Sequence, residues 1–233
     1  MSDSDSVSRR GFLATSALGV AALATKPAQA ASVRLLVFLH LDMKQRALQE
    51  LLSGALSSVE VVAVTRHGDL ERQLPEADAL LALEPVLAAS RLSPASLGVA
   101  GGRTTEPYVL LGAHGFDPGN LKKVGALDLL GRRGTSTFVE TVVGVNVEVE
   151  RVTKLEDLLP LLQFQMVDAV LVPERRAASL KAKSQLALTT SRASREVGLP
   201  AVSVIKAGGS AITEKLRRLP APICSQLGVD SWR

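Results

Sequence analysis

Apolar and polar residues alternate along the chain in a pattern that predicts strands and helices in turn. The apolar run at residues 33–39 predicts a buried strand. Apolar residues then recur at helical spacing over 43–56, and a second strand is expected at 59–65. A short helix at 69–74 and a strand at 77–83 follow. Because these intervals suit right-handed crossovers, they indicate parallel strands with flanking helices.

The pattern changes between residues 88 and 106, where Ser, Gly and Pro gather. This stretch predicts a surface loop or a boundary between two lobes. Beyond it, residues 123–143 predict a strand, a turn with two glycines and a helix that opens with small hydroxyl residues. The other expected elements are strands at 108–111, 146–152, 168–173, 185–190 and 201–205, helices at 155–164 and 175–182, and a terminal helix that ends at Leu219.

The junction within residues 123–143 offers a place for an anion. The first N–H groups of a helix lack intrahelical partners and carry the positive end of the helix dipole. Arg132 and Arg133 add positive charge beside it. The spacing of Gly131 and Gly134 matches neither the dinucleotide fingerprint nor a Walker A loop. A capped helix after a strand, with no ligand, is the alternative.

The first residues resemble a twin-arginine signal peptide. Residues 8–13 read Ser-Arg-Arg-Gly-Phe-Leu, an apolar run follows to Ala24, and the small-residue pattern Ala-Gln-Ala ends at Ala30. The resemblance implies export by the twin-arginine (Tat) machinery and cleavage after Ala30, which leaves a soluble periplasmic protein. The apolar run is short for a membrane anchor.

Composition argues against several classes of function. Aromatic residues make up 3% of the chain, so stacking platforms for nucleic acid are not expected. The net charge of +4 is spread along the chain. The single cysteine, Cys224, excludes an internal disulfide; a buried apolar role is expected for it, and a reactive thiol is the alternative.

Cofactor and catalytic motifs are not found in the sequence. His40, His67 and His114 have no metal-ligand spacing, and there is no Cys-x-x-Cys pair. A nucleophile elbow and a supported carboxylate pair are also missing. We therefore expect no cofactor, no metal and no catalysis.

Polar residues follow the expected strands of the first part of the chain. His40 and Asp42 come after the first strand, and Glu84 comes after the third. Ligands of open α/β sheets bind beyond the carboxyl ends of strands, so these residues are candidate contacts. A residue in such a position is more often a turn or helix-cap residue than a ligand contact, and that is the alternative for each.

Three segments together resemble the second lobe of type II periplasmic solute-binding proteins. They are Lys-Val-Gly-Ala-Leu at 123–127 with Gly-Arg-Arg-Gly-Thr-Ser at 131–136, the capping-box helix start at 153–159, and Met-Val-Asp-Ala-Val-Leu-Val at 166–172. The resemblance implies a two-lobed α/β Venus flytrap with mainly parallel sheets and flanking helices. It divides the chain into a signal peptide (1–30), lobe 1 (31–112), lobe 2 (113–200) and a segment that returns toward lobe 1 (201–233).

The resemblance also implies a set of ligand contacts in a cleft between the lobes. It places helix N-terminal contacts on Gly134, Thr135 and Ser136, an anion clamp on Arg132 or Arg133, first-lobe contacts near His40 and Glu84, and Asp168 with Pro173 and Glu174 near the hinge. The sequence Gln165-Met166-Val167 departs from the family's pattern, and this leaves room for a member that has lost transport.

The expected function is capture of a small, anionic solute for ABC-type uptake through a membrane permease. The alternative is an accessory or sensory protein of the same fold that serves an exported or membrane complex. An exported hydrolase or oxidoreductase would need the motifs that the chain lacks.

Overall fold

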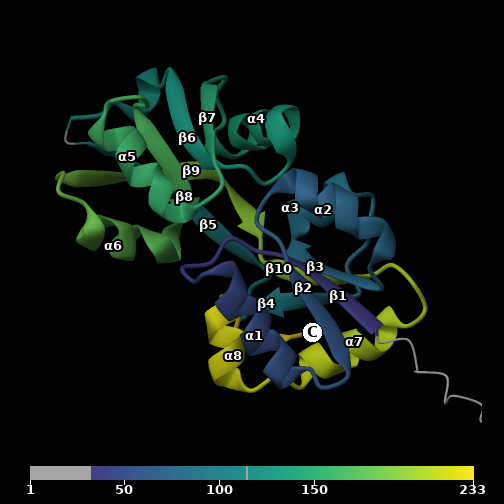
Figure 1. The fold of residues 1–233 in the computed structure, drawn as a ribbon. Coiled ribbons are helices and arrows are strands. Elements are labelled where there is room, and N and C mark those ends of the chain that lie inside the picture. The colour runs from purple at the N-terminus through teal and green to yellow at the C-terminus, as the bar shows by residue number, and fades with distance from the viewer. Residues whose placement is uncertain (1–32, 114) are drawn as a thin grey trace, which may run out of the picture. The chain divides into compact units, whose positions relative to one another are not determined.

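The computed structural model describes residues 33–113 and 115–233 (Figure 1). Ser32–Arg233 forms one compact unit. The expected signal peptide, its cleavage point after Ala30, and His114 lie outside the described residues. In the described ranges, no helix has both the length and the apolar character needed to cross a membrane.

The first lobe is built on a six-stranded sheet with the order β11-β4-β10-β3-β1-β2. These strands are β1 (Val33–Phe38), β2 (Val59–Ala63), β3 (Ala79–Leu83), β4 (Ser96–Val99), β10 (Pro200–Val204) and β11 (Ser231–Trp232). The central strands β1 and β3 are continuous apolar runs, and Leu35, Leu36, Leu80 and Leu81 are fully buried. Burial on both faces explains why the sequence shows runs here and no alternation.

The second lobe is built on a five-stranded sheet with the order β7-β6-β8-β5-β9. Its strands are β5 (Thr105–Ala113), β6 (Lys123–Leu127), β7 (Glu148–Val152), β8 (Ala169–Pro173) and β9 (Leu188–Gly198). Apolar clusters lie on both faces of this sheet, one around Val139 and Val142, the other around Leu158, Leu161 and Leu180.

Eight α-helices flank the two sheets in the described part of the chain (Figure 1). They are α1 (Gln45–Ala55), α2 (His67–Gln73), α3 (Glu84–Ala89), α4 (Gly131–Val143), α5 (Leu158–Gln163), α6 (Glu174–Lys183), α7 (Gly209–Arg217) and α8 (Ala221–Leu227), with short 3₁₀ turns η1 (Leu74–Glu76), η2 (Pro118–Asn120) and η3 (Leu155–Asp157). The two-lobed α/β architecture and the strand, turn and helix at 123–143 are confirmed.

Both sheets are mixed, whereas mainly parallel sheets were expected. β1 pairs in parallel with β2 and β3, and β6 pairs in parallel with β7 and β8. β5 and β10 run antiparallel to their neighbours, as β11 does to β4. β5 and β10 enter their sheets directly from the other lobe with no helix before them. A parallel strand needs a crossover connection, usually a helix, that returns the chain to the starting end of the sheet. β5 and β10 have no such connection before them and therefore run antiparallel.

The chain passes between the sheets twice, after β4 and after β9 (Figure 1). The two crossing segments lie side by side, because the backbone N–H of Leu199 donates to the carbonyl of Thr104 at 2.8 Å. We therefore propose lobe boundaries at residues 104 and 199 in place of 112 and 200. The difference arises because β5 begins at Thr105, before its apolar stretch.

Several local predictions differ from the structure. The stretch 88–106 was expected to be a surface loop or a boundary between lobes; it contains β4 and the start of β5, and the chain leaves the first sheet within it. The expected capping box at 153–156 is wrong: the 3₁₀ turn η3 is there, and its cap residue Lys154 makes no side-chain cap bond. The expected terminal helix to Leu219 is followed by a further helix, α8, which was not predicted; Pro222 lies in its first turn, where proline's missing N–H costs nothing.

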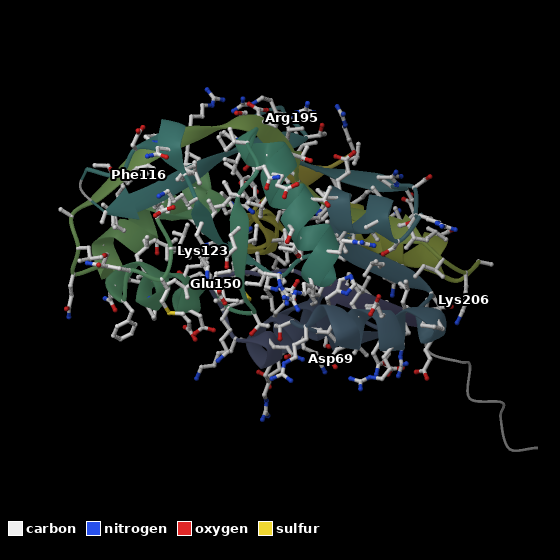
Figure 2. All side chains as sticks on the ribbon, turned by 90° about the horizontal axis from the view of Figure 1, so that it is seen from above. Asp69, Phe116, Lys123, Glu150, Arg195 and Lys206 are labelled. Carbon is white, nitrogen blue, oxygen red and sulfur yellow. The ribbon has the colours of Figure 1, made fainter. Side chains whose placement is uncertain are left out.

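Charged side chains hold together the amino-terminal ends of the parallel strands β6, β7 and β8 in the second sheet. Asp168 Oδ2 accepts hydrogen bonds from the backbone N–H groups of Lys122 and Lys123, each at 2.8 Å. The ammonium group of Lys123 lies 3.0 Å from both Glu148 and Glu150 (Figure 2). Asp78 acts like Asp168 in the first sheet, accepting from the N–H of Arg34 at 2.8 Å. Each aspartate thus aligns the start of a neighbouring strand.

Candidate ligand-binding site

The hydroxyl of Thr135 holds the turn that leads from β6 into α4. Thr135 is fully buried, and its Oγ1 accepts from the N–H of Leu130 at 2.9 Å and donates to Asp128 Oδ1 at 2.9 Å. Asp128 is also paired with Arg151 at 2.7 Å. Because its hydroxyl is fully engaged and shielded, Thr135 positions the turn and is not free to contact a solute.

Removal of the Thr135 hydroxyl is expected to destabilise the protein. A Thr135→Val variant keeps the side-chain shape but leaves the Leu130 N–H and one Asp128 oxygen without their partner, so we expect a loss of about 1–3 kcal/mol. Urea unfolding followed by circular dichroism measures this. Thr135→Ser is the matched control and should retain most of the stability; equal losses in both variants would contradict the bridging role.

Arg132 and Arg133 lie in the first turn of α4 and are exposed. Their backbone carbonyls accept hydrogen bonds from the hydroxyls of Ser136 and Thr137, at 3.1 and 3.2 Å. Gly131 has a φ of +68°, and a Cβ there would lie 3.2 Å from Nδ1 of His67 in α2. The α4 N-terminus therefore lies close against the first lobe, and its two arginines face solvent outside the pocket described next.

A pocket of about 410 Å³ lies between loops of the two lobes. Its first-lobe lining is residues 39–45 with Leu48, Ala63, Val64 and Thr65, and its second-lobe lining is residues 153–156. Leucine, methionine and alanine side chains form the walls. Charged residues of both signs belong to the lining: Asp42, Lys44, Lys154 and Glu156. The pocket is thus at the carboxyl ends of β1, β2 and β7, where open α/β sheets bind their ligands.

His40 belongs to this pocket and is a neutral group in it. Its Nε2 lies 3.1 Å from the carbonyl of Thr65, so Nε2 carries the proton, and Nδ1 is shielded from solvent without a hydrogen-bond partner. The ring packs edge-on against Phe38, with centroids 4.9 Å apart. Burial lowers the pKa of His40 to about 4, while the Thr65 carbonyl and the charge of Asp128 act in the opposite direction. His40 thus holds no positive charge at neutral pH.

Among the four charged residues of the lining, Lys154 lies near Glu156, and Asp42 is paired with a residue outside the lining. Both carboxylate oxygens of Asp42 lie 3.1 Å from the ammonium group of Lys183 in α6, so this contact joins the two lobes. Lys154 lies 3.9 Å from Glu156. The lining itself thus has two acids and two lysines, and the ammonium group of Lys183 lies beside one of the acids, Asp42.

Glu84 and Asp168 lie away from the pocket. Glu84 is the first residue of α3, and its side chain packs against Gly198 at the crossing between the lobes, where a Cβ would clash with it. Asp168 lies just before β8, at the amino-terminal end of this strand, whereas the pocket lies at the carboxyl end of β7. Of the expected contact residues, the structure brings His40 and Asp42 into the pocket. We withdraw Glu84 and Asp168 from the proposed site.

A buried ion pair at the crossing was not foreseen from the sequence. Glu106, in β5, is 8% exposed, and its Oε1 lies 3.0 Å from Nη2 of Arg175 in α6. Nη1 of Arg175 donates to the carbonyl of Gly228 at 2.5 Å, in the first lobe. Burial raises the pKa of Glu106, and Arg175 and Arg176 oppose this. The nearest sequence signal was the expected hinge position of Pro173 and Glu174.

Comparisons with known proteins agree on the fold. No protein-family model matches the chain, and no curated protein sequence matches it. Solved structures do match, each over 84% of this chain. A double mutant of the Bordetella pertussis BvgS VFT2 domain is 13% identical, with a TM-score of 0.56 and 91% of that domain covered.

Two further matches are solute-binding proteins. An arginine-bound mutant of ArgBP from T. maritima is 19% identical, with a TM-score of 0.52 and 94% of that chain covered. The substrate-binding protein of an amino acid ABC transporter is 13% identical, with a TM-score of 0.53 and 92% covered. The chain therefore has the two-lobed α/β Venus flytrap fold of these structures.

Proposed function

We propose that this protein binds a small zwitterionic solute, of amino-acid size, in the pocket between residues 39–48, 63–65 and 153–156. The observation that carries the proposal is the pocket itself. Both lobes line it, its volume of about 410 Å³ is in the usual range for small ligands, and its lining carries two acids and two lysines. A solute with one ammonium and one carboxylate complements that balance better than the anion expected from Arg132 and Arg133.

The structural likeness supports a binding role in the periplasm and no catalysis. Two similar structures are an arginine-bound mutant of ArgBP and the substrate-binding protein of an amino acid ABC transporter. The leader that resembles a twin-arginine signal peptide supports export. Delivery to an ABC permease is the first form of this proposal. A sensory or accessory role for an exported or membrane complex is the second form.

Thermal unfolding with a panel of solutes tests the proposal. Amino acids should stabilise the protein by about 2.7 kcal/mol when present at 100 times their dissociation constant. The corresponding amides and simple carboxylates, each of which lacks one charge, should stabilise it less. Glu156→Gln and Lys154→Gln should each weaken binding about tenfold or more, because each removes one charged hydrogen-bonding group.

Two controls make the outcome specific. Lys122→Gln removes an exposed lysine at the far edge of the second sheet and should leave binding unchanged. The double variant Arg132→Ala/Arg133→Ala should also bind normally. Stabilisation by oxyanions alone, lost in that double variant, would restore the α4 N-terminus as the site. No stabilisation by any solute would favour the accessory role.

A further inference from the structure

Apolar packing joins the two lobes at the place where a cleft would open. Leu127 at the end of β6 and Leu129 after it are 9% and 3% exposed. They belong to the same apolar cluster as Phe38 and Leu39 of the first lobe, and not to the clusters of the second sheet. Leu130, Val152 and Leu155 pack against that cluster as well. We call Leu127, Leu129 and Leu130 the leucine seam.

Helix α6 of the second lobe adds polar ties at both of its ends. Near its N-terminus, Arg175 donates to the Gly228 carbonyl at 2.5 Å; Lys183, its last residue, pairs with Asp42 at 3.1 Å. Gly228 follows α8 and Asp42 precedes α1, so both partners belong to the first lobe. A third contact places His67 of α2 against Gly131 of α4. We call the two ties of Arg175 and Lys183 the α6 clasp.

A binding cleft that opens readily has polar, hydrated walls, because separating them exposes little apolar surface. The leucine seam has the opposite character: separating the lobes would bring buried leucine side chains into water, and the α6 clasp would lose its bonds. No solute is needed for any of these contacts. The closed arrangement is therefore stabilised by the chain's own residues.

We propose that the two lobes rest closed without a solute, held by the leucine seam and the α6 clasp. A solute in the pocket, which both lobes line in this closed arrangement, then reinforces a conformation that already dominates. Since a ligand shifts an equilibrium only by its differential affinity for the two states, solute binding causes little further closure. The proposal concerns the resting conformation and holds whichever solute binds.

Small-angle X-ray scattering on the purified protein, freed of solute and checked by mass spectrometry, tests the resting state. The wild-type radius of gyration should equal that calculated for the closed structure. Leu129→Asp places a charge in the seam and should increase the radius while the far-ultraviolet circular dichroism is unchanged. Val145→Asp is the matched control: Val145 is 47% exposed, and its substitution should not change the radius.

Two scattering results would overturn the proposal. One is a solute-free wild type as extended as the Leu129→Asp variant; the other is a folded Leu129→Asp variant with the wild-type radius.

If Leu129→Asp does not fold, a cross-linking experiment tests the closed resting state instead. His67→Cys/Arg132→Cys, made with Cys224→Ser, leaves the leucine seam and the α6 clasp intact and should react intramolecularly with a short bismaleimide without solute, because Gly131 beside Arg132 lies against His67; His67→Cys/Val145→Cys should not. Failure of the first pair to cross-link would also overturn the closed resting state.

Discussion

Replacement of Arg175 by methionine is expected to lower the free energy of unfolding by about 2–4 kcal/mol, because the buried Glu106 carboxylate loses its ion-pair partner and keeps only the charge of Arg176 nearby. The same change removes the bond to the Gly228 carbonyl. Urea unfolding at pH 7 measures the loss. Glu106→Gln combined with Arg175→Met should recover part of the stability, since a neutral amide is less costly to bury than an unpaired carboxylate.

The pH dependence provides an independent check on the Arg175 prediction. Burial raises the folded-state pKa of Glu106, so the folded protein binds the proton more tightly than the unfolded chain does. This group therefore favours the fold at low pH and loses that contribution as pH rises above the unfolded value. Arg175→Met should extend the loss to higher pH, and adding Glu106→Gln should abolish it. A loss in Arg175→Met that does not vary with pH would contradict the ion pair.

The second large expected effect is a loss of stability at acid pH caused by His40. Its pKa of about 4 in the folded protein lies below the ordinary value of 6.5, so the unfolded chain binds more protons between these values. Stability from this residue is complete above pH 6.5 and falls as the pH drops toward 4. By pH 4 the loss should reach about 3 kcal/mol, at 1.36 kcal/mol per pKa unit.

The contribution of His40 to the free energy of unfolding is isolated by comparing wild type with His40→Gln between pH 7.5 and 4. Glutamine retains a donor for the Thr65 carbonyl but cannot take up a proton, so its stability should fall less steeply with acid. In the nuclear magnetic resonance spectrum, the His40 ring signals should shift only near pH 4, whereas an ordinary histidine titrates near 6.5. Parallel stability curves for the two proteins would show that His40 is not held neutral by burial.

The candidate site was only partly accessible from the sequence. His40 was expected at the end of the first strand, and it does line the pocket. Arg132 and Arg133 were expected to clamp an anion, and the helix they begin is present, but they face solvent outside the pocket. Spacing along the chain shows that a side chain lies near a helix start. It does not show whether that side chain points into a pocket between the lobes or into solvent, because this depends on where the other lobe lies.

The sequence by itself determined most of the strands and helices in their order, because alternation and helical spacing follow from backbone geometry within a few residues. It did not indicate the short elements α3, β4, α8 and β11. It also determined the strand, turn and helix of 123–143. Only the tertiary structure decided that Glu106 meets Arg175, that Asp42 meets Lys183 and that Leu129 packs into the first lobe's core. These residues are distant in sequence, and their burial and pairing depend on how complete lobes pack together, which no local pattern encodes.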